Sequence, residues 1–414
     1  MSGALRKKWS RACALIAVVA LLGGSCASQE PDGGDTVILI GLDAMGWDFR
    51  DKTDTPNLDR LVARGVMAER LVPVFPTKTF PNHYSIVTGL HVEDHGIIAN
   101  SMYDPAMDAW FSLGNRDAVT DPRWWGGEPI WVTAEKQGLT AAAFFWPGTE
   151  TAIQGVRPTF WNPYDGSIPN TERVNQVLAW LDLPLSARPA LITLYFSDVD
   201  DAAHRSGTES EETRAAIRRV DAVIGELIGG LEARGIADAV NIIVASDHGM
   251  VDIALDRVIF LDDYLDLERV TVVDWNPVAS LRPPPDEIDL VYRALDGAHP
   301  NWSVYRKDDI PDRYHYRQNG RVQPILVVAD EGWSITSRDF HAARPDRHAG
   351  ANHGYDNQLV SMGATFIAAG PAFRRGEVVP PFQNIHIYEM LCAILDLTPA
   401  ANAGSLDSVR AVLR

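Results

Sequence analysis

Short, continuous apolar runs recur along the chain and predict buried β-strands. The first, Thr36–Asp43 (TVILIGLD), is apolar almost throughout and ends in a carboxylate. Continuous runs, unlike alternating ones, are typical of strands that are buried on both faces of a parallel sheet. Similar runs follow at Ala141–Phe145, Ala190–Phe196, Val240–Ser246, Ile325–Ala329 and Thr365–Ala369.

Amphipathic helices are predicted between several of these strands. The clearest has apolar residues three and four positions apart at Ile217, Val220, Ile224, Leu227 and Leu231. Another starts at Thr55-Pro56 and stops at Gly65, and a third spans Ile385–Leu395. Strands that alternate with helices predict an α/β fold whose central, mostly parallel sheet is flanked by helices.

Residues 257–348 depart from this pattern. They are rich in prolines and aromatic residues, as in the stretches RPPP at 282–285 and IPDRYHY at 310–316. We expect them to form a smaller, irregular α+β elaboration that packs against the main sheet. The prediction is therefore one catalytic domain over residues 36–414 with an insertion-like segment at about 257–348.

The N-terminal residues are typical of an export signal. A basic stretch at positions 6–11 precedes the apolar run Ala12–Leu22, which is too short for a permanent membrane span. We predict a signal peptide over residues 1–26 and a polar linker over 27–35. Cys26 is either the lipid-modified residue of a bacterial lipoprotein or lies near an ordinary cleavage site. The expected location is the bacterial periplasm or, with a lipid anchor, the outer membrane.

Composition narrows the class of partner. The formal charge is −18, with 55 acidic and 37 basic residues. This balance argues against binding of polymeric nucleic acid, which needs a basic surface. Small phosphorylated molecules remain possible partners, because bound divalent metals reverse the local field. With three cysteines in the chain, a disulfide framework is not expected. No pattern indicates an oligomer, so a monomer is expected by default.

Aspartate and histidine side chains gather where predicted strands end. Sites in open α/β sheets lie beyond the carboxyl ends of the strands, and such oxygen and nitrogen ligands suit divalent metals. Alone, each motif is more often a helix cap, a solvated pair or a turn, so the prediction of a metal site depends on their joint occurrence. The six candidate ligands are Asp43, Asp200, His204, Asp247, His248 and His353.

Thr79 is the candidate nucleophile, in the stretch PTKTFPNHY at 76–84. Pro81 suits the start of a helix, so Thr79 is expected beside a helix N-terminus, where free N–H groups favour a phosphoryl group. A threonine hydroxyl is a weak nucleophile unless a metal or a base helps to remove its proton. Without the metal candidates, Thr79 would be an ordinary residue of a proline-rich turn.

Longer motifs occur in a fixed order over nearly the whole predicted catalytic domain. They are TKTFPNHYSIVTG (77–89), NSMYD (100–104), WWGGEPIW (124–131), FWPG (145–148), DHGM (247–250) and NHGYDN (352–357). Through them the chain resembles the nucleotide pyrophosphatase/phosphodiesterase family (type I phosphodiesterases) of the alkaline phosphatase superfamily. That resemblance implies an alkaline phosphatase-like fold.

The resemblance also implies two Zn²⁺ ions per chain. One would be held by Asp200, His204 and His353. The other would be held by a second set, Asp43, Asp247 and His248, together with the Thr79 oxygen. Iron or manganese is an alternative occupant of these sites.

The remaining site residues follow from the same resemblance. Asn100 and the backbone amide of Phe80 would contact a phosphate oxygen. Phe80 and Tyr195 would sandwich a nucleotide base, with Leu113 completing the slot; the alternative for Tyr195 is a buried strand aromatic. The three tryptophans Trp124, Trp125 and Trp131 are expected to be scaffold.

The expected function is hydrolysis of phosphodiester or phosphoanhydride bonds of nucleotides and related diesters. A covalent intermediate on Thr79 would release nucleoside 5′-monophosphates. One alternative is a hydrolase with the same metals that acts on phosphomonoesters, phosphonates or phospholipid and choline diesters. Lys78 is the only cationic neighbour of Thr79, which favours diesters over monoesters. Another alternative, from a different class, is a non-catalytic envelope protein that binds nucleotides.

Overall fold

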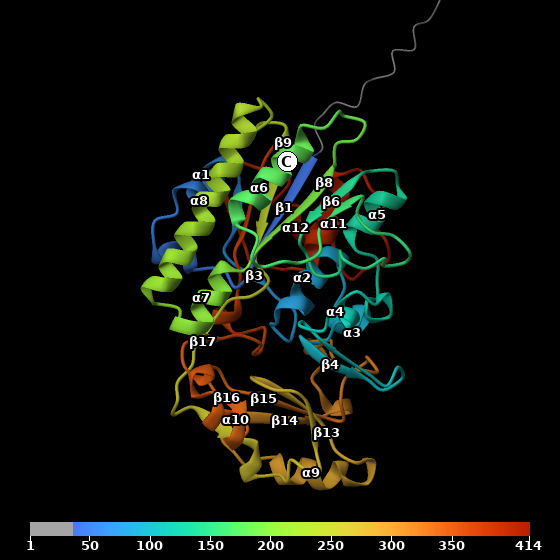
Figure 1. The fold of residues 1–414 in the computed structure, drawn as a ribbon, viewed down its shortest axis with the longest axis vertical. Helices are drawn as coiled ribbons and strands as arrows, with labels where there is room; N and C mark the ends of the chain where they lie inside the picture. Colours follow the sequence, from blue (N-terminus) through green and yellow to red (C-terminus); the bar gives the residue numbers. More distant parts are fainter. Residues whose placement is uncertain (1–35) are drawn as a thin grey trace, which may run out of the picture. The chain divides into compact units, whose positions relative to one another are not determined.

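The computed structural model describes residues 36–414, so the predicted signal peptide and linker lie outside the described residues. The described chain centres on an eight-stranded sheet in the order β19-β2-β18-β9-β1-β8-β6-β7 (Figure 1). β18 runs antiparallel to both neighbours, and the other pairings are parallel. The predicted α/β fold with a mostly parallel sheet is confirmed. The strands are β1 (Thr36–Leu42), β2 (Val66–Ala68), β6 (Ala141–Phe144), β7 (Phe160–Trp161), β8 (Leu191–Phe196), β9 (Val240–Ala245), β18 (Phe366–Ala369) and β19 (Glu377–Val379).

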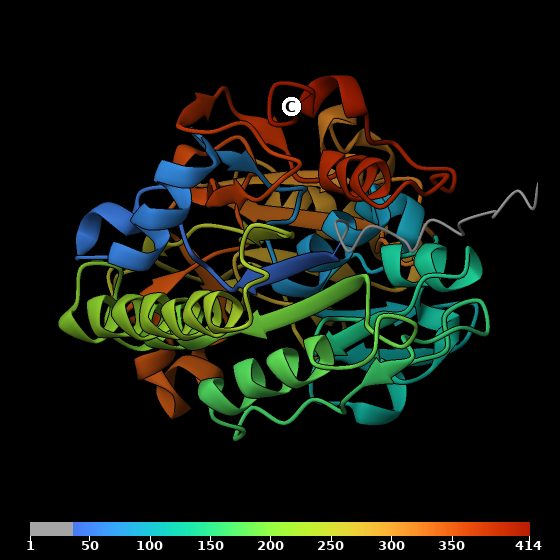
Figure 2. The same cartoon turned by 90° about the horizontal axis from the view of Figure 1, so that it is seen from above.

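Helices cover both faces of this sheet, which explains why its central strands are apolar throughout. Successive side chains of a strand point to opposite faces. On β1, Ile38 and Ile40 pack with α1 (Pro56–Arg64), α6 (Asn170–Leu181) and α8 (Glu211–Ala233). Val37 and Leu39 pack on the other face with α2 (Thr79–Thr88), α5 (Ile130–Lys136) and α11 (His386–Ile394). Seen along the sheet, the helices form a layer on either side of it (Figure 2).

The three predicted helices all occur. The apolar stripe at 217–231 lies on α8, the Thr55–Gly65 segment forms α1 with Gly65 as its C-cap, and the Ile385–Leu395 segment forms α11. Cys392 is a free, buried thiol on α11. No helix among the described residues is both long and apolar enough to cross a membrane.

A second, smaller unit of structure lies between β10 (Val251–Asp252) and β17 (Ala351–Asn352), which pair antiparallel. Its core is an antiparallel sheet in the order β12-β13-β15-β14, with α9 (Ile288–Leu295), seen in the lower part of Figure 1. The predicted strand Ile325–Ala329 is β15 of this sheet and does not join the central one. Its other elements are β11 (Val258–Phe260), β12 (Thr271–Asp274), β13 (Val278–Arg282), β14 (Trp302–Arg306), β16 (Ser334–Thr336) and α10 (Arg338–Ala343).

Short elements complete the described chain. They are the paired strands β3 (Leu71–Val72) and β20 (Phe382–Gln383), the hairpin of β4 (Ser101–Asp104) and β5 (Ala109–Ser112), and the helices α3 (Val92–His95), α4 (Arg116–Val119), α7 (Asp198–Ser206) and α12 (Leu406–Val409). Of these, α7 matters most for the site, because it directly follows the central strand β8.

Candidate functional site

Three adjacent parallel strands deliver most of the predicted metal ligands to one edge of the sheet. β1 lies between β8 and β9 and is parallel to both. Asp43 directly follows β1, and Asp247 and His248 follow β9. Helix α7 follows β8 and places Asp200 and His204 one helical turn apart. Carboxyl ends of parallel strands meet at the same edge, as the sequence pattern predicted.

The two predicted ligand groups meet at His248, which also offers a ligand atom within 4.8 Å of those of Asp200 and His353. In the first group, Oδ1 of Asp200 lies 3.3 Å from Nε2 of His204 and 3.6 Å from Nε2 of His353. In the second, Nε2 of His248 lies 3.0 Å from Asp247 Oδ2 and 3.6 Å from Asp43 Oδ1. Two ligands about 2 Å from a tetrahedral ion are about 3.3 Å apart, so this spacing suits a small cation.

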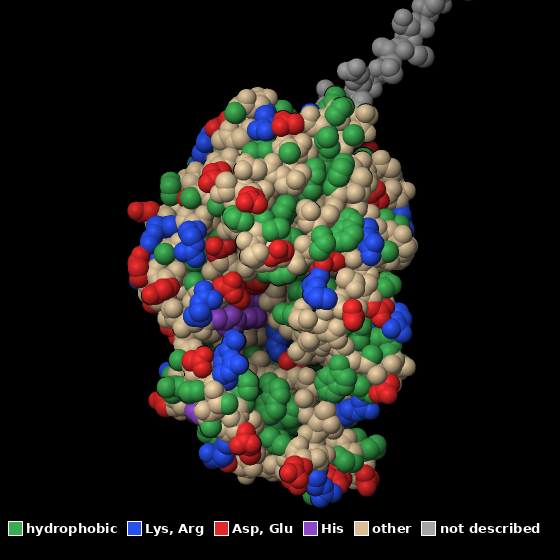
Figure 3. All heavy atoms as spheres, in the orientation of Figure 1, with side chains coloured by type: hydrophobic (Ala, Val, Ile, Leu, Met, Phe, Trp, Pro, Cys, Tyr) green, Lys and Arg blue, Asp and Glu red, His purple; other side chains and the backbone are tan. Residues whose placement is uncertain are grey.

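The two groups meet at a pair of histidine rings. The imidazoles of His248 and His353 stack with their centroids 3.6 Å apart and their planes at 11°. The side chain of His204 is 33% exposed, against 8% for His353 and 0% for His248. Histidine side chains are also visible at the rim of a hollow in the space-filling view (Figure 3). The His204 side of the site is therefore the side that solvent reaches.

Backbone carbonyls fix the tautomer of the three histidines. Nδ1 lies 2.9 Å from the Ala351 carbonyl in His204, 3.0 Å from the Gly249 carbonyl in His248 and 2.8 Å from the Thr77 carbonyl in His353. A carbonyl oxygen only accepts hydrogen bonds, so each Nδ1 carries the proton and donates it. In the neutral ring each Nε2 is then left with its lone pair, which is the state that binds a metal.

Buried polar atoms without partners mark the same place. Within residues 36–414, four ligand atoms are buried and form no hydrogen bond: Asp43 Oδ1, Asp200 Oδ1, Asp247 Oδ2 and His248 Nε2. Buried polar atoms in folded proteins are normally bonded. Burial, with the nearby charges of Asp247 and Asp200, raises the pKa of the Asp43 carboxyl well above its usual value. Divalent cations would supply the missing partners and positive charge, so the residues fit the predicted metal site.

His83 is a member of this cluster that the sequence pattern missed, because it lies inside a helix and not at a strand end. Its ring, Asp43 and Asp247 offer ligand atoms within 4.8 Å of one another. In His83, unlike the other three histidines, the nitrogen that faces the carboxylates is Nδ1, which lies 3.2 Å from Asp247 Oδ2. This Nδ1 also lies 3.0 Å from the Thr79 carbonyl, so it carries the proton. Its Nε2 lies beside Gly41 and Trp146. His83 therefore fits a supporting position better than that of a ligand.

Thr79 is the first residue of α2, two residues earlier than Pro81 suggested for the helix start. It lines one cavity with Asp43 and Asp200. The backbone N–H of Phe80 donates to Oδ1 of Asn100 over 3.0 Å. In this arrangement the Phe80 amide, expected to be a phosphate donor, is already bonded, and the amide nitrogen of Asn100 is the donor that is left.

The cavity beside Thr79 has a volume of about 230 Å³ and brings together the predicted base-slot residues Phe80, Leu113 and Tyr195. Tyr195 is only 8% exposed, and its hydroxyl donates to Asp43. A more exposed aromatic side chain of the same cavity lining is Tyr164, which is 43% exposed. Sequence reasoning missed Tyr164 because its segment has no strand or helix signal. Trp124, Trp125 and Trp131 are buried, as expected for scaffold.

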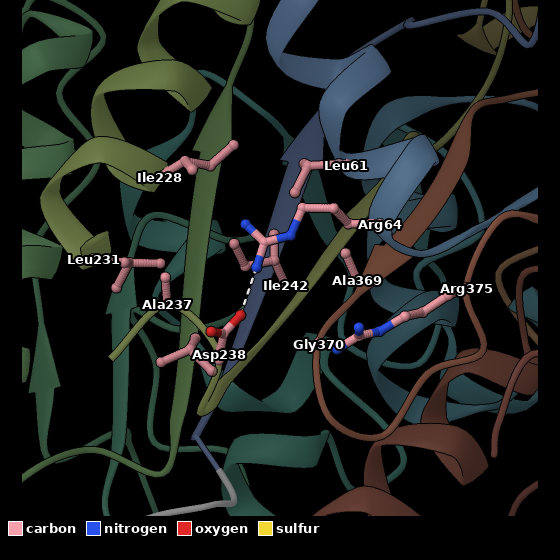
Figure 4. A pocket seen from close by; sticks show the side chains of 11 residues that line it. Leu61, Arg64, Ile228, Leu231, Ala237, Asp238, Ile242, Ala369, Gly370 and Arg375 are labelled. Carbon is pink, nitrogen blue, oxygen red and sulfur yellow. Dashed lines mark hydrogen bonds and ion pairs between the residues drawn. The ribbon is translucent and has the colours of Figure 1, made fainter. Parts of the chain in front are cut away.

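Another cavity lies at the opposite ends of the central strands, between α1, α8 and the start of β9 (Figure 4). Arg64 points into it and pairs with Asp238 at 2.6 Å. Its volume of about 30 Å³ leaves room for roughly one water molecule. It is therefore too small to be the substrate site.

Comparisons with known proteins point to one family. The profile described as type I phosphodiesterase / nucleotide pyrophosphatase matches residues 37–356. Human ectonucleotide pyrophosphatase/phosphodiesterase family member 5 is 39% identical over 387 residues, which cover 93% of this chain and 79% of that protein. Mouse bis(5′-adenosyl)-triphosphatase enpp4 is 38% identical over 407 residues, covering 96% and 86% of the two chains.

A solved structure agrees with this result. Mouse ectonucleotide pyrophosphatase/phosphodiesterase 5, an inactive threonine-to-alanine variant in complex with AMP, superimposes with a TM-score of 0.87 at 39% identity. The match covers 92% of this chain and 100% of that one.

Proposed function

Because the chain belongs to the type I phosphodiesterase / nucleotide pyrophosphatase family, we propose that it hydrolyses phosphodiester and phosphoanhydride bonds of nucleotides. The observation that carries this proposal is a single cavity shared by Thr79, two carboxylates of the ligand groups and several aromatic side chains. One relative is named as a bis(5′-adenosyl)-triphosphatase and another was solved with AMP. Bis(5′-adenosyl) triphosphate and AMP are both nucleotides, which supports a nucleotide substrate here.

Two zinc ions are part of the proposal. Asp200, His204 and His353 would hold one, and the second set, Asp43, Asp247 and His248 with the Thr79 hydroxyl, would hold the other. When bound, a pair of such cations supplies positive charge that stabilises the attacking and leaving oxygens of an in-line displacement.

Thr79 performs the proposed covalent chemistry. Its hydroxyl oxygen forms a bond to phosphorus while the bond to the departing alcohol or pyrophosphate breaks, which leaves a nucleotidyl-threonine ester. Water then attacks the same phosphorus, releases the nucleoside 5′-monophosphate and regenerates the Thr79 hydroxyl. The N-terminus of α2 lies at Thr79, beside the phosphoryl group, and the Asn100 amide nitrogen is a donor there. Two inversions give net retention of configuration at phosphorus.

Phe80 and Tyr164 are proposed to hold the nucleotide base, with Leu113 at the edge of the slot. All three line the cavity beside Thr79. Aromatic faces reward a flat base with stacking energy but discriminate weakly between bases. Tyr195 is proposed to orient Asp43, to which its hydroxyl donates, and not to stack on the base.

The charges near Thr79 favour diesters over monoesters. Lys78 is 5% exposed and its ammonium group pairs with Asp274 of β12, so it is not directed at the phosphate. Among the described residues that line the cavity, Arg116 is the only Lys or Arg, and it pairs with Glu150. No free side-chain cation of this cavity lining is thus left for the second negative charge of a monoester.

The test compares hydrolysis of thymidine 5′-(4-nitrophenyl) phosphate with that of 4-nitrophenyl phosphate by the zinc-loaded protein. We expect a clear preference for the diester, and a loss of at least about 10³-fold in kcat for Thr79→Ala, because the nucleophile is removed. Thermal unfolding of Thr79→Ala checks that the variant is folded. A preference for the monoester, or a Thr79→Ala protein as active as the wild type, would contradict the proposal.

A further inference from the structure

Thr77, two residues before the proposed nucleophile, joins two distant parts of the site. It is fully buried, with 0% exposure. Its hydroxyl accepts a hydrogen bond from the Gly354 N–H over 2.9 Å and donates to the Tyr355 carbonyl over 3.1 Å. Its own carbonyl accepts from Nδ1 of His353 over 2.8 Å. One residue therefore makes three hydrogen bonds to the segment 353–355.

These bonds fix the geometry between a metal ligand and the nucleophile. The hydrogen bond between the Thr77 carbonyl and Nδ1 sets the orientation of the His353 ring. The two hydrogen bonds of the Thr77 hydroxyl hold the backbone next to this ring. On the other side, the Thr77 backbone leads directly into the first turn of α2, where Thr79 begins the helix. A shift of the 353–355 segment would thus change the distance between His353 and Thr79.

The segment 353–355 is otherwise held mainly by Tyr355, which is fully buried and whose hydroxyl donates to the Trp333 carbonyl over 3.0 Å. His353 follows the two-residue strand β17. Gly354 has φ of 107°, a left-handed conformation that favours glycine. A Cβ at this position would lie 2.8 Å from Pro277 and 3.1 Å from the Lys78 side chain, so the backbone is closely packed. The Thr77 hydroxyl is the hydrogen-bond partner of this tight turn.

We propose that Thr77 is a positioning residue, which holds the metal ligand His353 in register with Thr79 through its hydroxyl. This inference rests on the proposed function. Thr77 touches neither substrate nor metal; it acts through the 353–355 segment. Partners that orient metal ligands typically change metal affinity or activity by about 10–100-fold when they are removed.

The experiment replaces Thr77 by valine, which keeps the branched shape but removes the hydroxyl. The Gly354 N–H then loses its acceptor inside the protein. In the full-length, zinc-loaded protein we expect kcat on thymidine 5′-(4-nitrophenyl) phosphate to fall by about 10–100-fold, with KM changed by less than about threefold. We also expect one of the two zinc ions to be bound more weakly by a similar factor. Transfer of zinc to the chromophoric chelator 4-(2-pyridylazo)resorcinol measures this affinity.

Two further variants separate positioning from general stability. Thr77→Ser keeps the hydroxyl and is expected to restore kcat and zinc retention. Thr133→Val is the matched control, because Thr133 is also 0% exposed and its hydroxyl bonds Glu128 and Tyr388, away from the site. We expect Thr133→Val to lower the melting temperature but to leave kcat and zinc retention unchanged.

Three outcomes would overturn the role of Thr77. They are wild-type kcat and zinc retention in Thr77→Val, a Thr77→Ser protein as impaired as Thr77→Val, or an equal loss of kcat in Thr133→Val. A wild-type protein that does not hydrolyse the diester at all would instead contradict the proposed function. The zinc-retention measurements would still test Thr77 in that case.

Discussion

Lys78 and Asp274 form an ion pair almost without solvent contact. Their side chains are 6% and 14% exposed, and the pair joins the residue before α2 to strand β12 of the smaller sheet. A buried ion pair adds little net stability, because both charges lose their hydration. Removing one partner is different, since the other charge stays buried and unpaired. The pair is therefore a point at which single and double substitutions should behave differently.

We predict that Asp274→Ala destabilises the protein by roughly 3–5 kcal/mol, because it leaves the Lys78 ammonium buried without a partner. The double variant Lys78→Met/Asp274→Leu replaces both charges by apolar groups of similar volume and should recover most of this loss. Chemical denaturation of the three proteins measures the free energies of unfolding. Equal destabilisation of the single and double variants would contradict this account.

At the scale of elements, the smaller sheet is tied to the rest of the chain by Arg321. Its guanidinium donates to Asp104 at the end of β4 over 2.8 Å and to the Gly96 and Trp124 carbonyls, each over 2.7 Å. Burial alone would raise the pKa of the Asp104 carboxyl. Hydrogen bonds from Arg321, with those from the N–H groups of Met107 and Ala106, outweigh burial and lower this pKa below 3.8.

A lowered native pKa means that the folded protein binds this proton less tightly than the unfolded chain. The Asp104 contribution to stability is therefore fully present above pH 3.8 and is lost as the pH falls through the lower native value. We predict that Asp104→Asn costs about 1–2 kcal/mol at pH 7, and that the difference from wild type narrows in acid. Urea denaturation of both proteins at pH 7, 5 and 3 measures this difference in the free energy of unfolding.

The control is Asp407→Asn, whose exposed pair with Arg410 should contribute nothing measurable. If the cost of Asp104→Asn stayed constant from pH 7 to pH 3, the charge of Asp104 would not be its source.

The sequence predicted those elements whose signal is local. Continuous apolar runs identified β1, β8 and β9, and helical spacing identified α8. Because these strands are parallel and adjacent, their ends also identified five of the six candidate ligands. Other features depend on contacts that no local pattern contains. The strand at 325–329 belongs to the smaller sheet, Tyr164 lies in an irregular segment, and Thr77 bonds residues 277 and 278 positions away.

At the scale of the whole molecule, the buried carboxylates of Asp43 and Asp247 and the half-buried carboxylate of Asp200 meet at one edge of the central sheet. Asp43, Asp200 and Asp247 repel one another unless cations lie between them. We therefore predict that chelation lowers the melting temperature by several degrees and that added zinc restores it, because a ligand at about 100 times its Kd stabilises by about 2.7 kcal/mol.

The effect of Asp43→Asn on the melting temperature should have opposite signs in the metal-free and the zinc-bound protein. Without metal the variant should melt above the wild type, because one repelling charge is gone. With zinc it should melt below the wild type, because a ligand is lost. Differential scanning calorimetry with and without chelator measures both. A variant that melts below the wild type in both states would show that Asp43 is needed for packing alone.

The pairing of β10 with β17 has a consequence for how the chain tolerates changes of length. These two-residue strands lie just after Asp247-His248 and just before His353, so the chain leaves the cluster of candidate ligands and returns to it at nearly the same point. Everything enclosed by this closure is a module whose ends are clamped together. Insertions or deletions within that module would leave its paired ends in place, and with them the candidate ligands on either side.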